Sequence, residues 1–296
     1  MSSDGPRVLV TGASGSVGAA VLRELLPHQR AGRLRLRAAS RSQQHRTRFE
    51  QEGIEPVELD YAAGSGVAAA MAGVDRLFLC TGYTVDMLVH SKVVLDAARA
   101  AGVRQVVHLG ALAPPGTYLA HFVWHDYVET YIERQGFQFT HLRPRAFMQN
   151  VLSSVRPRAF KLPHFSADGL IAWIDADDIA RVAAAALLDP PAHAGKVYPL
   201  AEDAMTMEQV AGVIREVTGL PYEAQPRDPE SFLPTLLKAG MEPTYAASLA
   251  QGTLATARGQ AASAAGTYDT VRAVTGRPGV RWTEFARLHR DRFGAT

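Results

Sequence analysis

Short apolar runs alternate with longer amphipathic runs over the first two-thirds of the chain. The apolar runs have the composition of β-strands and occupy residues 7–12, 34–41, 54–60, 74–82, 104–111 and 137–144. Two intervening runs, residues 17–26 and 86–102, place apolar residues at helical spacing, and the second ends at Gly102. Strands that alternate with helices through short connections predict a parallel sheet with helices on both faces, the doubly wound α/β class.

This alternation breaks after Arg145, and residues 145–172 show no clear period. A helix over residues 177–189, N-capped by Asp177, and a strand over residues 196–200 then return the chain to the sheet. The rest of the chain predicts helices separated by Pro and Gly loops. These helices are expected at residues 206–218, 231–239 and 282–293.

The length of 296 residues suits one large domain with a smaller lobe. We expect the α/β domain to comprise residues 1–144 and 173–200, and a mostly helical lobe to comprise residues 145–172 and 201–296. The net charge of +2 argues against nucleic acid or an anionic membrane as partner. The single cysteine, Cys80, excludes an internal disulfide and suits a reducing compartment. With neither a signal-peptide pattern nor a spanning apolar run, a cytoplasmic protein is expected.

The stretch "VTGASGSVG" carries the first candidate chemistry, because it lies between the first strand and the first helix. Its glycines follow a G-x-x-G-x-x-G spacing. Gly12 suits a tight turn, Gly15 a close approach to a pyrophosphate, and Gly18 close helix–sheet packing. The N–H groups at the start of the helix point at the phosphates, and the hydroxyls can add hydrogen bonds. The dinucleotide-binding residues expected here are Gly12, Ser14, Gly15, Ser16, Val17 and Gly18.

The end of the second strand indicates which dinucleotide is bound. An NAD site places an Asp or Glu there, but no acidic residue lies between Glu24 and Glu50, and seven arginines do. The guanidinium of Arg41, with Ser40 and Ser42 beside it, suits the 2′-phosphate of NADP. Some of the seven arginines must belong to a solvated face. Contacts to adenine and ribose are expected from Asp60, Thr81 and Gly82, which follow the third and fourth strands.

With these residues in place, the chain resembles the NmrA-like family of atypical short-chain dehydrogenases/reductases. That family includes quinone reductases, azoreductase-like proteins, isoflavone-reductase-like enzymes and redox-sensing regulators. The resemblance covers about residues 7–220 and is carried by "VTGASGSVG", "VVHLGALAP", "HFVWHDYVETYIERQGFQFTHLRPRAFMQN", "WIDADDIARVAAAALLDP" and "GKVYPLAEDAMTMEQVAGVI". It implies a Rossmann domain that binds a nicotinamide cofactor.

The chain departs from the superfamily pattern at the acid–base residues. Many of these reductases use a Tyr-x-x-x-Lys pair. The tyrosine protonates the substrate, and the lysine lowers the pKa of the tyrosine. None of the nine tyrosines here has a lysine four residues later, and the matching positions are His121 and His125. Gly110 or Ala111 stands where the partner serine is expected. These departures argue against alcohol–ketone chemistry by the usual mechanism.

His121, His125 and Glu129 recur every four residues and form one row on a helix. In one interpretation His125 replaces the lysine and bonds the nicotinamide ribose, while His121 or Tyr118 faces the substrate. In a second, Glu129 orients His125 in a purely structural network. In a third, the two histidines share a metal ion, but the expected glutamate and third ligand are missing, so no metal is predicted.

The segment "RPRAFMQN", residues 143–150, follows the sixth strand, where such a sheet opens into its ligand crevice. The resemblance implies that Arg143 and Pro144 flank the nicotinamide. An apolar substrate pocket is expected, although core packing is the alternative for each aromatic residue. The residues expected to line this pocket are Tyr83, Phe147, Met148, Asn150, Phe160 and Trp173.

These features predict an NADPH-dependent reductase that transfers hydride to a quinone-like or other conjugated small molecule. Such acceptors are electrophilic and need little acid–base help, so the reaction survives the loss of the tyrosine–lysine pair. Two alternatives remain open from the sequence: a non-catalytic NADP(H)-sensing regulator, and a biosynthetic isomerase or cyclase that uses the same site without net redox change. An apolar or aromatic substrate is expected, and an oligomer is compatible with the sequence.

Overall fold

The chain forms two compact units in the computed structural model, which describes residues 5–64, 66–82, 84–114, 116–155, 159–261 and 265–294. The first unit consists of Met1–Gly110, Trp124–Arg143 and Ile179–Tyr198, and the second of Ala111–Val123, Pro144–Asp178 and Pro199–Thr296. Residues 111–123, 144, 173–178 and 199–200 therefore group with the second unit, whereas the sequence analysis assigned them to the α/β domain. Within the second unit, the backbone N–H of His121 donates to Ser248 Oγ.

A seven-stranded sheet forms the centre of the first unit, in the order β10-β6-β5-β4-β1-β2-β3. The pairs β3–β2, β2–β1, β1–β4, β4–β5 and β5–β6 are parallel. The strand order reverses between β1 and β4, which is where ligands bind in sheets of this kind. The strands are β1 (Arg7–Val10), β2 (Arg35–Ala39), β3 (Glu55–Val57), β4 (Arg76–Leu79), β5 (Gln105–Leu109), β6 (Gln138–Pro144) and β10 (Lys196–Leu200).

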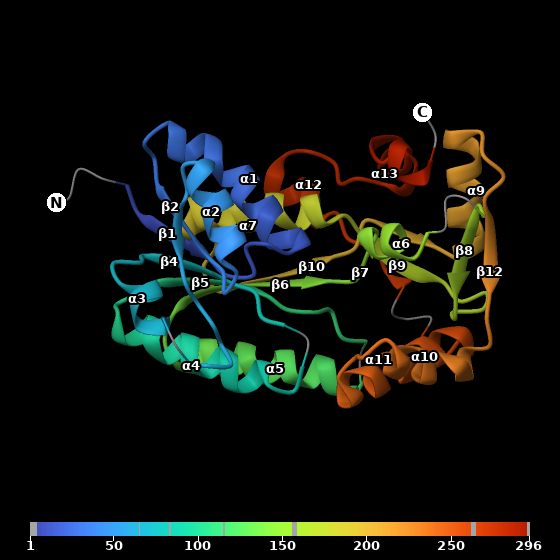
Figure 1. Ribbon diagram of the computed structural model, residues 1–296, viewed down its shortest axis with the longest axis horizontal. Coiled ribbons are helices and arrows are strands. Elements are labelled where there is room, and N and C mark those ends of the chain that lie inside the picture. Colours follow the sequence, from blue (N-terminus) through green and yellow to red (C-terminus); the bar gives the residue numbers. More distant parts are fainter. Residues whose placement is uncertain are drawn as a thin grey trace. The chain divides into compact units, whose positions relative to one another are not determined.

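Helices cover both faces of this sheet, as predicted (Figure 1). One face carries α1 (Ser16–Arg30), α2 (Gln43–Gln51) and α7 (Ala176–Leu188). The other carries α3 (Val67–Met71), α4 (Met87–Ala100) and α5 (Ala120–Arg134). A short helix, α8 (Pro190–His193), precedes β10. The protein thus has the predicted doubly wound, Rossmann-like α/β fold.

Burial of apolar side chains on both faces explains why the central strands are almost continuously hydrophobic. All five residues of β5 are buried, and Val8, Leu9 and Val10 of β1 are completely inaccessible. Parallel strands covered by helices on both sides have this composition, because each strand has two apolar neighbours. Val21 and Leu25, one turn apart on α1, are also fully buried.

The second unit contains two small sheets and several helices. Its sheets are ordered β11-β9-β7 and β12-β8. Three of its elements, β7, α6 and β8, lie within residues 145–172, where the sequence shows no clear period, and β9 begins in this segment at Ile171. The elements are β7 (Ala146–Phe147), α6 (Gln149–Ser154), β8 (Lys161–His164), β9 (Ile171–Ile174), β11 (Asp203–Met205), α9 (Met207–Thr218), β12 (Glu223–Pro226), η1 (Pro229–Ser231), α10 (Phe232–Lys238), α11 (Pro243–Ala257), α12 (Thr270–Thr275), α13 (Trp282–Leu288) and η3 (Arg290–Phe293).

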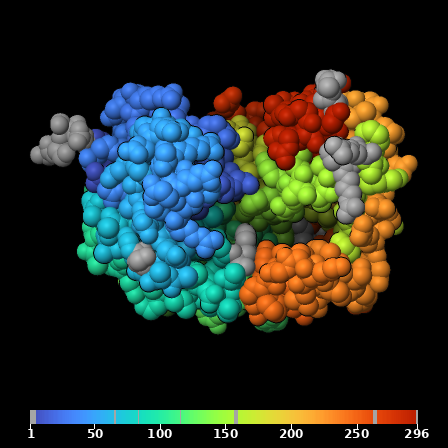
Figure 2. All heavy atoms as spheres, in the orientation of Figure 1, coloured from blue at the N-terminus to red at the C-terminus, as the bar shows by residue number. Residues whose placement is uncertain are grey.

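An aromatic core holds the second unit together. The rings of Trp173 and Trp282 meet edge to face with their centroids 5.2 Å apart, and Phe285 packs on Trp282 in the same manner at 5.3 Å. Ile214 of α9 belongs to the same buried cluster. Helices α10 and α11 pack together, and their residues form one continuous orange surface in Figure 2. The core aromatics come from distant parts of the sequence, so this unit depends on long-range packing.

Two local predictions for helix ends were wrong. Helix α7 begins at Ala176. In its first turn the backbone N–H of Asp177 donates to Asp175 Oδ1 at 3.0 Å, so Asp175 and not Asp177 supplies the cap. The segment 282–293 is divided into α13 and η3 at His289 instead of forming one helix. Within the described residues, no helix has the length and apolar character needed to cross a membrane.

Candidate functional site

The loop between β1 and α1 owes its shape to two of its three glycines. Gly12 has a φ of +60°, and a Cβ there would lie 2.9 Å from Cys80 Sγ. A Cβ on Gly18 would lie 2.2 Å from the carbonyl oxygen of Gly12. Gly15, the N-cap of α1, has an ordinary φ of −83° and is exposed. Gly12 and Gly18 are therefore needed by the loop itself, whereas Gly15 leaves its outer surface open.

The exposed part of this loop coincides with the beginning of α1. Ser14 and Ser16 are exposed along with Gly15, and the first turn of the helix carries no acidic residue. The side chain of Val17 is buried, so only its backbone N–H is available to a ligand. A helix N-terminus with free N–H groups and a positive dipole end favours an anion. This geometry suits the phosphates that the glycine spacing predicted.

Thr11 anchors the loop, a role that the sequence analysis missed. Its hydroxyl donates to the carbonyl oxygen of Phe78 at 3.0 Å and accepts the N–H of Cys80 at 2.8 Å. The side chain is completely buried. These bonds tie the end of β1 to the end of β4, at the point where the strand order reverses. A threonine directly after an apolar strand could have suggested such a tie.

The turn after β2 leaves Arg41 exposed and engages its neighbours in local bonds. Ser42 caps α2, and its own N–H donates to Ser40 Oγ at 3.2 Å. The guanidinium of Arg46 donates to the carbonyl oxygens of Ser40 and Arg41 at 2.9 and 3.0 Å, and it pairs with Glu58 at 3.2 Å. Arg46 therefore stiffens the turn from within, and the side chain of Arg41 remains exposed to solvent.

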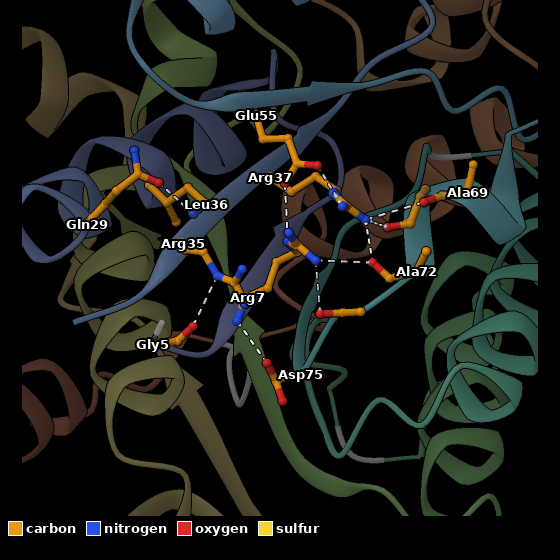
Figure 3. A network of polar contacts seen from close by, with 12 residues as sticks. Gly5, Arg7, Gln29, Arg35, Leu36, Arg37, Glu55, Ala69, Ala72 and Asp75 are labelled. Carbon is orange, nitrogen blue, oxygen red and sulfur yellow. Dashed lines mark hydrogen bonds and ion pairs between the residues drawn. The ribbon is translucent and has the colours of Figure 1, made fainter. Parts of the chain in front are cut away.

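A second arginine of the basic stretch is structural. Arg37 is buried, donates to the carbonyl oxygens of Ala70 and Ala72 at 2.8 and 2.9 Å, and pairs with Glu55 at 2.7 Å (Figure 3). Glu55 also pairs with Arg7 of β1 at 3.2 Å. The carbonyls belong to the C-terminal end of α3, where a cation is favourable. Arg37 thus belongs to neither the solvated face nor the predicted cofactor site.

The remaining cofactor candidates of the first unit follow β3 and β4. Asp60 is half-buried, and its Oδ1 accepts the N–H of Ala62 at 2.9 Å, so it shapes its own turn. Thr81 is half-buried and Gly82 is exposed, directly after the strand end. Tyr83, a predicted substrate residue, lies outside the described residues. The cofactor roles of these positions stay predictions.

A buried group of charged and imidazole side chains lies where α5 packs against β5 and β6. Glu129 of α5 is 4% exposed, and Arg143 of β6 binds its carboxylate through Nε at 3.1 Å and Nη2 at 2.5 Å. His108 of β5 has its ring centroid 5.4 Å from that of His125 and 5.7 Å from that of His141. The residue expected to orient His125 is therefore itself held by Arg143, which was expected beside the nicotinamide.

Three members of this group have the chemistry of metal ligands. The ligand atoms of His108, Glu129 and His141 all lie within 4.8 Å of one another. Because Arg143 already occupies the carboxylate of Glu129, a cation would have to displace it. Burial is the main cause that lowers the pKa of His108 well below its ordinary value and that of His141 to about 4. The arrangement is that of a buried ion pair among neutral imidazoles.

Acid is expected to destabilise the fold through two buried imidazoles, those of His121 and His141. Burial lowers the pKa of His121 and of His141 from 6.5 to about 4 in the folded chain, so the unfolded chain binds more protons between these values. Stability should be unaffected above pH 6.5 and fall as the pH drops toward 4, by roughly 3 kcal/mol for each histidine. Urea denaturation at pH 7.5, 6.0 and 4.5 measures this, and His141→Leu should flatten the slope. Equal stability at pH 7.5 and 4.5 would contradict the prediction.

The predicted catalytic residues of the second unit differ in burial. Tyr118 is 91% exposed. His121, at the start of α5, is 8% exposed, and its Nδ1 lies 2.7 Å from Ser248 Oγ of α11. The ring of Tyr245 meets that of His121 edge to face at 5.9 Å. The sequence analysis did not predict α11. It also missed the contact between His121 and Ser248, because these two residues lie 127 positions apart in the sequence.

The predicted substrate residues also divide by burial. Met148 and Trp173 lie in the aromatic core of the second unit and are 0% and 4% exposed. The packing of Trp173 agrees with the core alternative considered for the aromatic residues, and Met148 packs in the same core. Phe147 and Phe160 are half-buried, and Asn150 is exposed. Pro144 is buried, and its carbonyl oxygen accepts the N–H of Leu112 at 2.9 Å. Contact with a ligand stays a prediction for all of them.

Comparison with known proteins agrees with this fold. The model of the NmrA-like family matches residues 5–262. The chain belongs to the NmrA-like family. It is 29% identical to the NAD(P)H azoreductase of Xenophilus azovorans, over 97% of this chain and 99% of the relative. It is 28% identical to quinone oxidoreductase 2 of Escherichia coli K12, over 85% of this chain and 88% of the relative.

Solved structures of other proteins share the fold. The triphenylmethane reductase of Citrobacter sp., complexed with NADP(H), has a TM-score of 0.79 at 23% identity, covering 95% of this chain and 99% of the other. The quinone oxidoreductase of Escherichia coli, complexed with NADPH, has a TM-score of 0.79 at 24% identity, with the same coverage. The resemblance seen in the sequence motifs is confirmed at the level of family and fold.

Proposed function

We propose that the protein is an NADPH-dependent reductase that delivers hydride to a quinone-like or other conjugated small molecule. The observation that carries this proposal is the pair of loops at the carboxyl ends of β1 and β2. These strands are parallel neighbours, so both loops emerge at the same edge of the sheet. One presents the open N-terminus of α1, and the other presents the exposed Arg41.

The cofactor is assigned from the charges at these two loops. The N–H groups around Gly15 and Ser16 bind the pyrophosphate, since the first turn of α1 has no acidic residue to compete. The guanidinium of Arg41 binds the 2′-phosphate that distinguishes NADPH from NADH. Arg46 stabilises the turn by its hydrogen bond to the carbonyl oxygen of Ser40, and Glu58 neutralises the charge of Arg46. The two loops therefore divide the anionic groups of the cofactor between them.

The class of acceptor follows from the missing acid–base pair. Without a tyrosine–lysine pair, the protein has little means of protonating a simple ketone, whereas a quinone accepts hydride because it is electrophilic. Relatives of similar length are named as an azoreductase and a quinone oxidoreductase. In this assignment His125 takes the place of the lysine beside the nicotinamide ribose, and Tyr118 and His121 act toward the acceptor.

The direct test is NADPH oxidation, followed by absorbance at 340 nm, against a panel of benzoquinones, naphthoquinones and azo dyes. Turnover with at least one conjugated acceptor, and none with simple aliphatic ketones, is the expected result. Tight NADPH binding without turnover of any acceptor would refute the reductase. It would favour the NADP(H)-sensing alternative.

Replacement of Arg41 by Asp tests the cofactor assignment. We expect NADPH binding to weaken about 10- to 100-fold, because charge-assisted hydrogen bonds are worth about 1.5–3 kcal/mol, while NADH binding changes little. Isothermal titration calorimetry with both cofactors measures the difference. Arg48→Asp is the matched control, because Arg48 is 71% exposed on the neighbouring helix and pairs with Glu52 at the surface. An unchanged preference for NADPH would refute the role of Arg41.

A further inference from the structure

One hydroxyl in the second unit makes two contacts with the same histidine. Ser248 Oγ lies 2.7 Å from His121 Nδ1 and accepts the backbone N–H of His121 at 3.3 Å. Both residues are buried, with exposures of 3% for Ser248 and 8% for His121. Next to Ser248 on α11, a Cβ on Gly252 would lie 3.2 Å from Leu119, so the helix approaches this part of the chain closely.

The two contacts bear on the direction of the hydrogen bond to the ring. A backbone N–H can only donate, so Ser248 Oγ is an acceptor toward it and keeps its single proton for another partner. Two other helical hydroxyls of the second unit, those of Thr218 and Thr256, give that proton to the carbonyl oxygen four residues earlier. Ser248 lies within bonding distance of the ring instead. This arrangement favours donation of the Ser248 proton to Nδ1, which places the ring proton of a neutral His121 on Nε2.

We propose that Ser248 is a positioning residue that holds His121 as its Nε2–H tautomer, so that this ring offers a neutral N–H donor to the hydrogen-bond acceptor atom of the conjugated substrate. The proposal rests on the proposed function, which assigns His121 to the acceptor. It narrows the substrate class to molecules whose reducible system ends in an oxygen or nitrogen with a lone pair, as quinone carbonyls and azo groups do.

The surroundings of His121 keep the ring uncharged. Burial alone lowers its pKa to about 4, and the titratable neighbour packed on it, Tyr245 of α11, has its pKa raised to about 12 by burial. A ring that is neutral at pH 7 cannot act as an imidazolium acid. Its N–H group acts as a fixed hydrogen-bond donor, and this hydrogen bond is strongest when negative charge develops on the acceptor atom in the transition state.

The electron and proton balance is complete with this role. A hydride leaves the nicotinamide of NADPH, which becomes NADP⁺, and its two electrons reduce the acceptor. A quinone carbonyl then carries negative charge on oxygen, which the Nε2–H of His121 stabilises by a hydrogen bond. Solvent supplies the proton that completes the hydroquinone, and His121 begins and ends neutral.

The tautomer is tested without reference to catalysis. In ¹⁵N-histidine-labelled protein, two-bond ¹H–¹⁵N spectra identify which ring nitrogen is protonated, and His121→Gln assigns the signal. We expect a protonated Nε2 and a hydrogen-bonded Nδ1 in the unmodified protein at pH 7. Ser248→Ala should shift the Nδ1 resonance, Ser248→Thr should restore it, and Thr244→Ala, an exposed hydroxyl on the same helix, should leave it unchanged. A protonated Nδ1 would overturn the proposal.

Kinetics test the role toward the substrate. Ser248→Ala should lower kcat/KM for a quinone roughly tenfold through misplacement of the donor, with the NADPH Kd unchanged, and Ser248→Thr should recover most of the loss. The kcat/KM of the unmodified protein should be level from pH 5.5 to 8.5. A fall in rate with an apparent pKa near 6.5 would assign imidazolium chemistry to His121 and overturn the proposal. Absence of turnover with every acceptor would refute the proposed function, while the spectra would still decide the tautomer.

Discussion

Gly18→Ala is expected to weaken NADPH binding more than 100-fold, because the glycine loop cannot keep its shape with a Cβ at this position. That atom would lie 2.2 Å from the carbonyl oxygen of Gly12 and 2.7 Å from its carbonyl carbon. Both are backbone atoms of the loop itself, so relief requires the loop to move. A displacement of about 1 Å redirects the N–H groups that bind phosphate and is enough for a large loss. Calorimetric titration of NADPH measures the effect.

Gly212→Ala provides the matched control for this substitution. Gly212 lies within α9, and the nearest atom to its added Cβ would be Arg215 Nη2 at 3.7 Å, an ordinary contact. The change should leave NADPH binding intact and raise stability by up to about 1 kcal/mol, since alanine is the better helix former. Circular dichroism separates a local change at Gly18 from loss of the whole fold. Normal affinity in Gly18→Ala would contradict the role of the glycine loop.

Arg143→Met is expected to lower the free energy of unfolding by about 3 kcal/mol. It leaves the carboxylate of Glu129, only 4% exposed, without its cation, and an unpaired buried charge costs far more than a lost surface contact. The value lies at the low end of the range for buried ion pairs, because a third of the Arg143 side chain reaches solvent. Urea denaturation at pH 7.5 measures the change.

An exposed ion pair and a double variant complete this experiment. Glu230→Gln breaks the surface ion pair between Glu230, which is 62% exposed, and Arg258, which is 55% exposed. It should lower the free energy of unfolding by less than about 1 kcal/mol. Replacing Glu129 by Leu together with Arg143→Met should recover much of the loss, because both charges then leave the interior. A cost for Arg143→Met no larger than that of Glu230→Gln would mean that the buried pair does not stabilise the fold.

The sequence predicted the first unit far better than the second. All seven strands of the large sheet were expected, although each of the first six is shorter than its predicted run, as β3 is at Glu55–Val57. Strands buried on both faces leave an apolar run that the sequence displays directly. Residues 145–172 also contain strands, but β7 has two residues and β9 pairs with strands on both sides. Such short elements are stabilised by their partners and leave no period of their own.

The candidate site follows the same division. The conformation of the loop at Gly12, the open start of α1 and the exposed Arg41 agree with the local pattern, since a strand, a glycine loop and a helix are contiguous in sequence. The row of His121, His125 and Glu129 was also predicted, but not the partners of its members. Arg143 binds Glu129 from a strand 14 residues away, and Ser248 reaches His121 from a helix 127 residues away.

The sequence by itself determined the α/β class, the family and a loop suited to a dinucleotide, because each depends on the order and spacing of residues along the chain. Tertiary structure decided which arginine is buried, which carboxylate is paired and which histidine nitrogen faces a hydroxyl. Those outcomes depend on which side chains from distant segments share a low-dielectric interior, where a charge or a polar atom must find a partner.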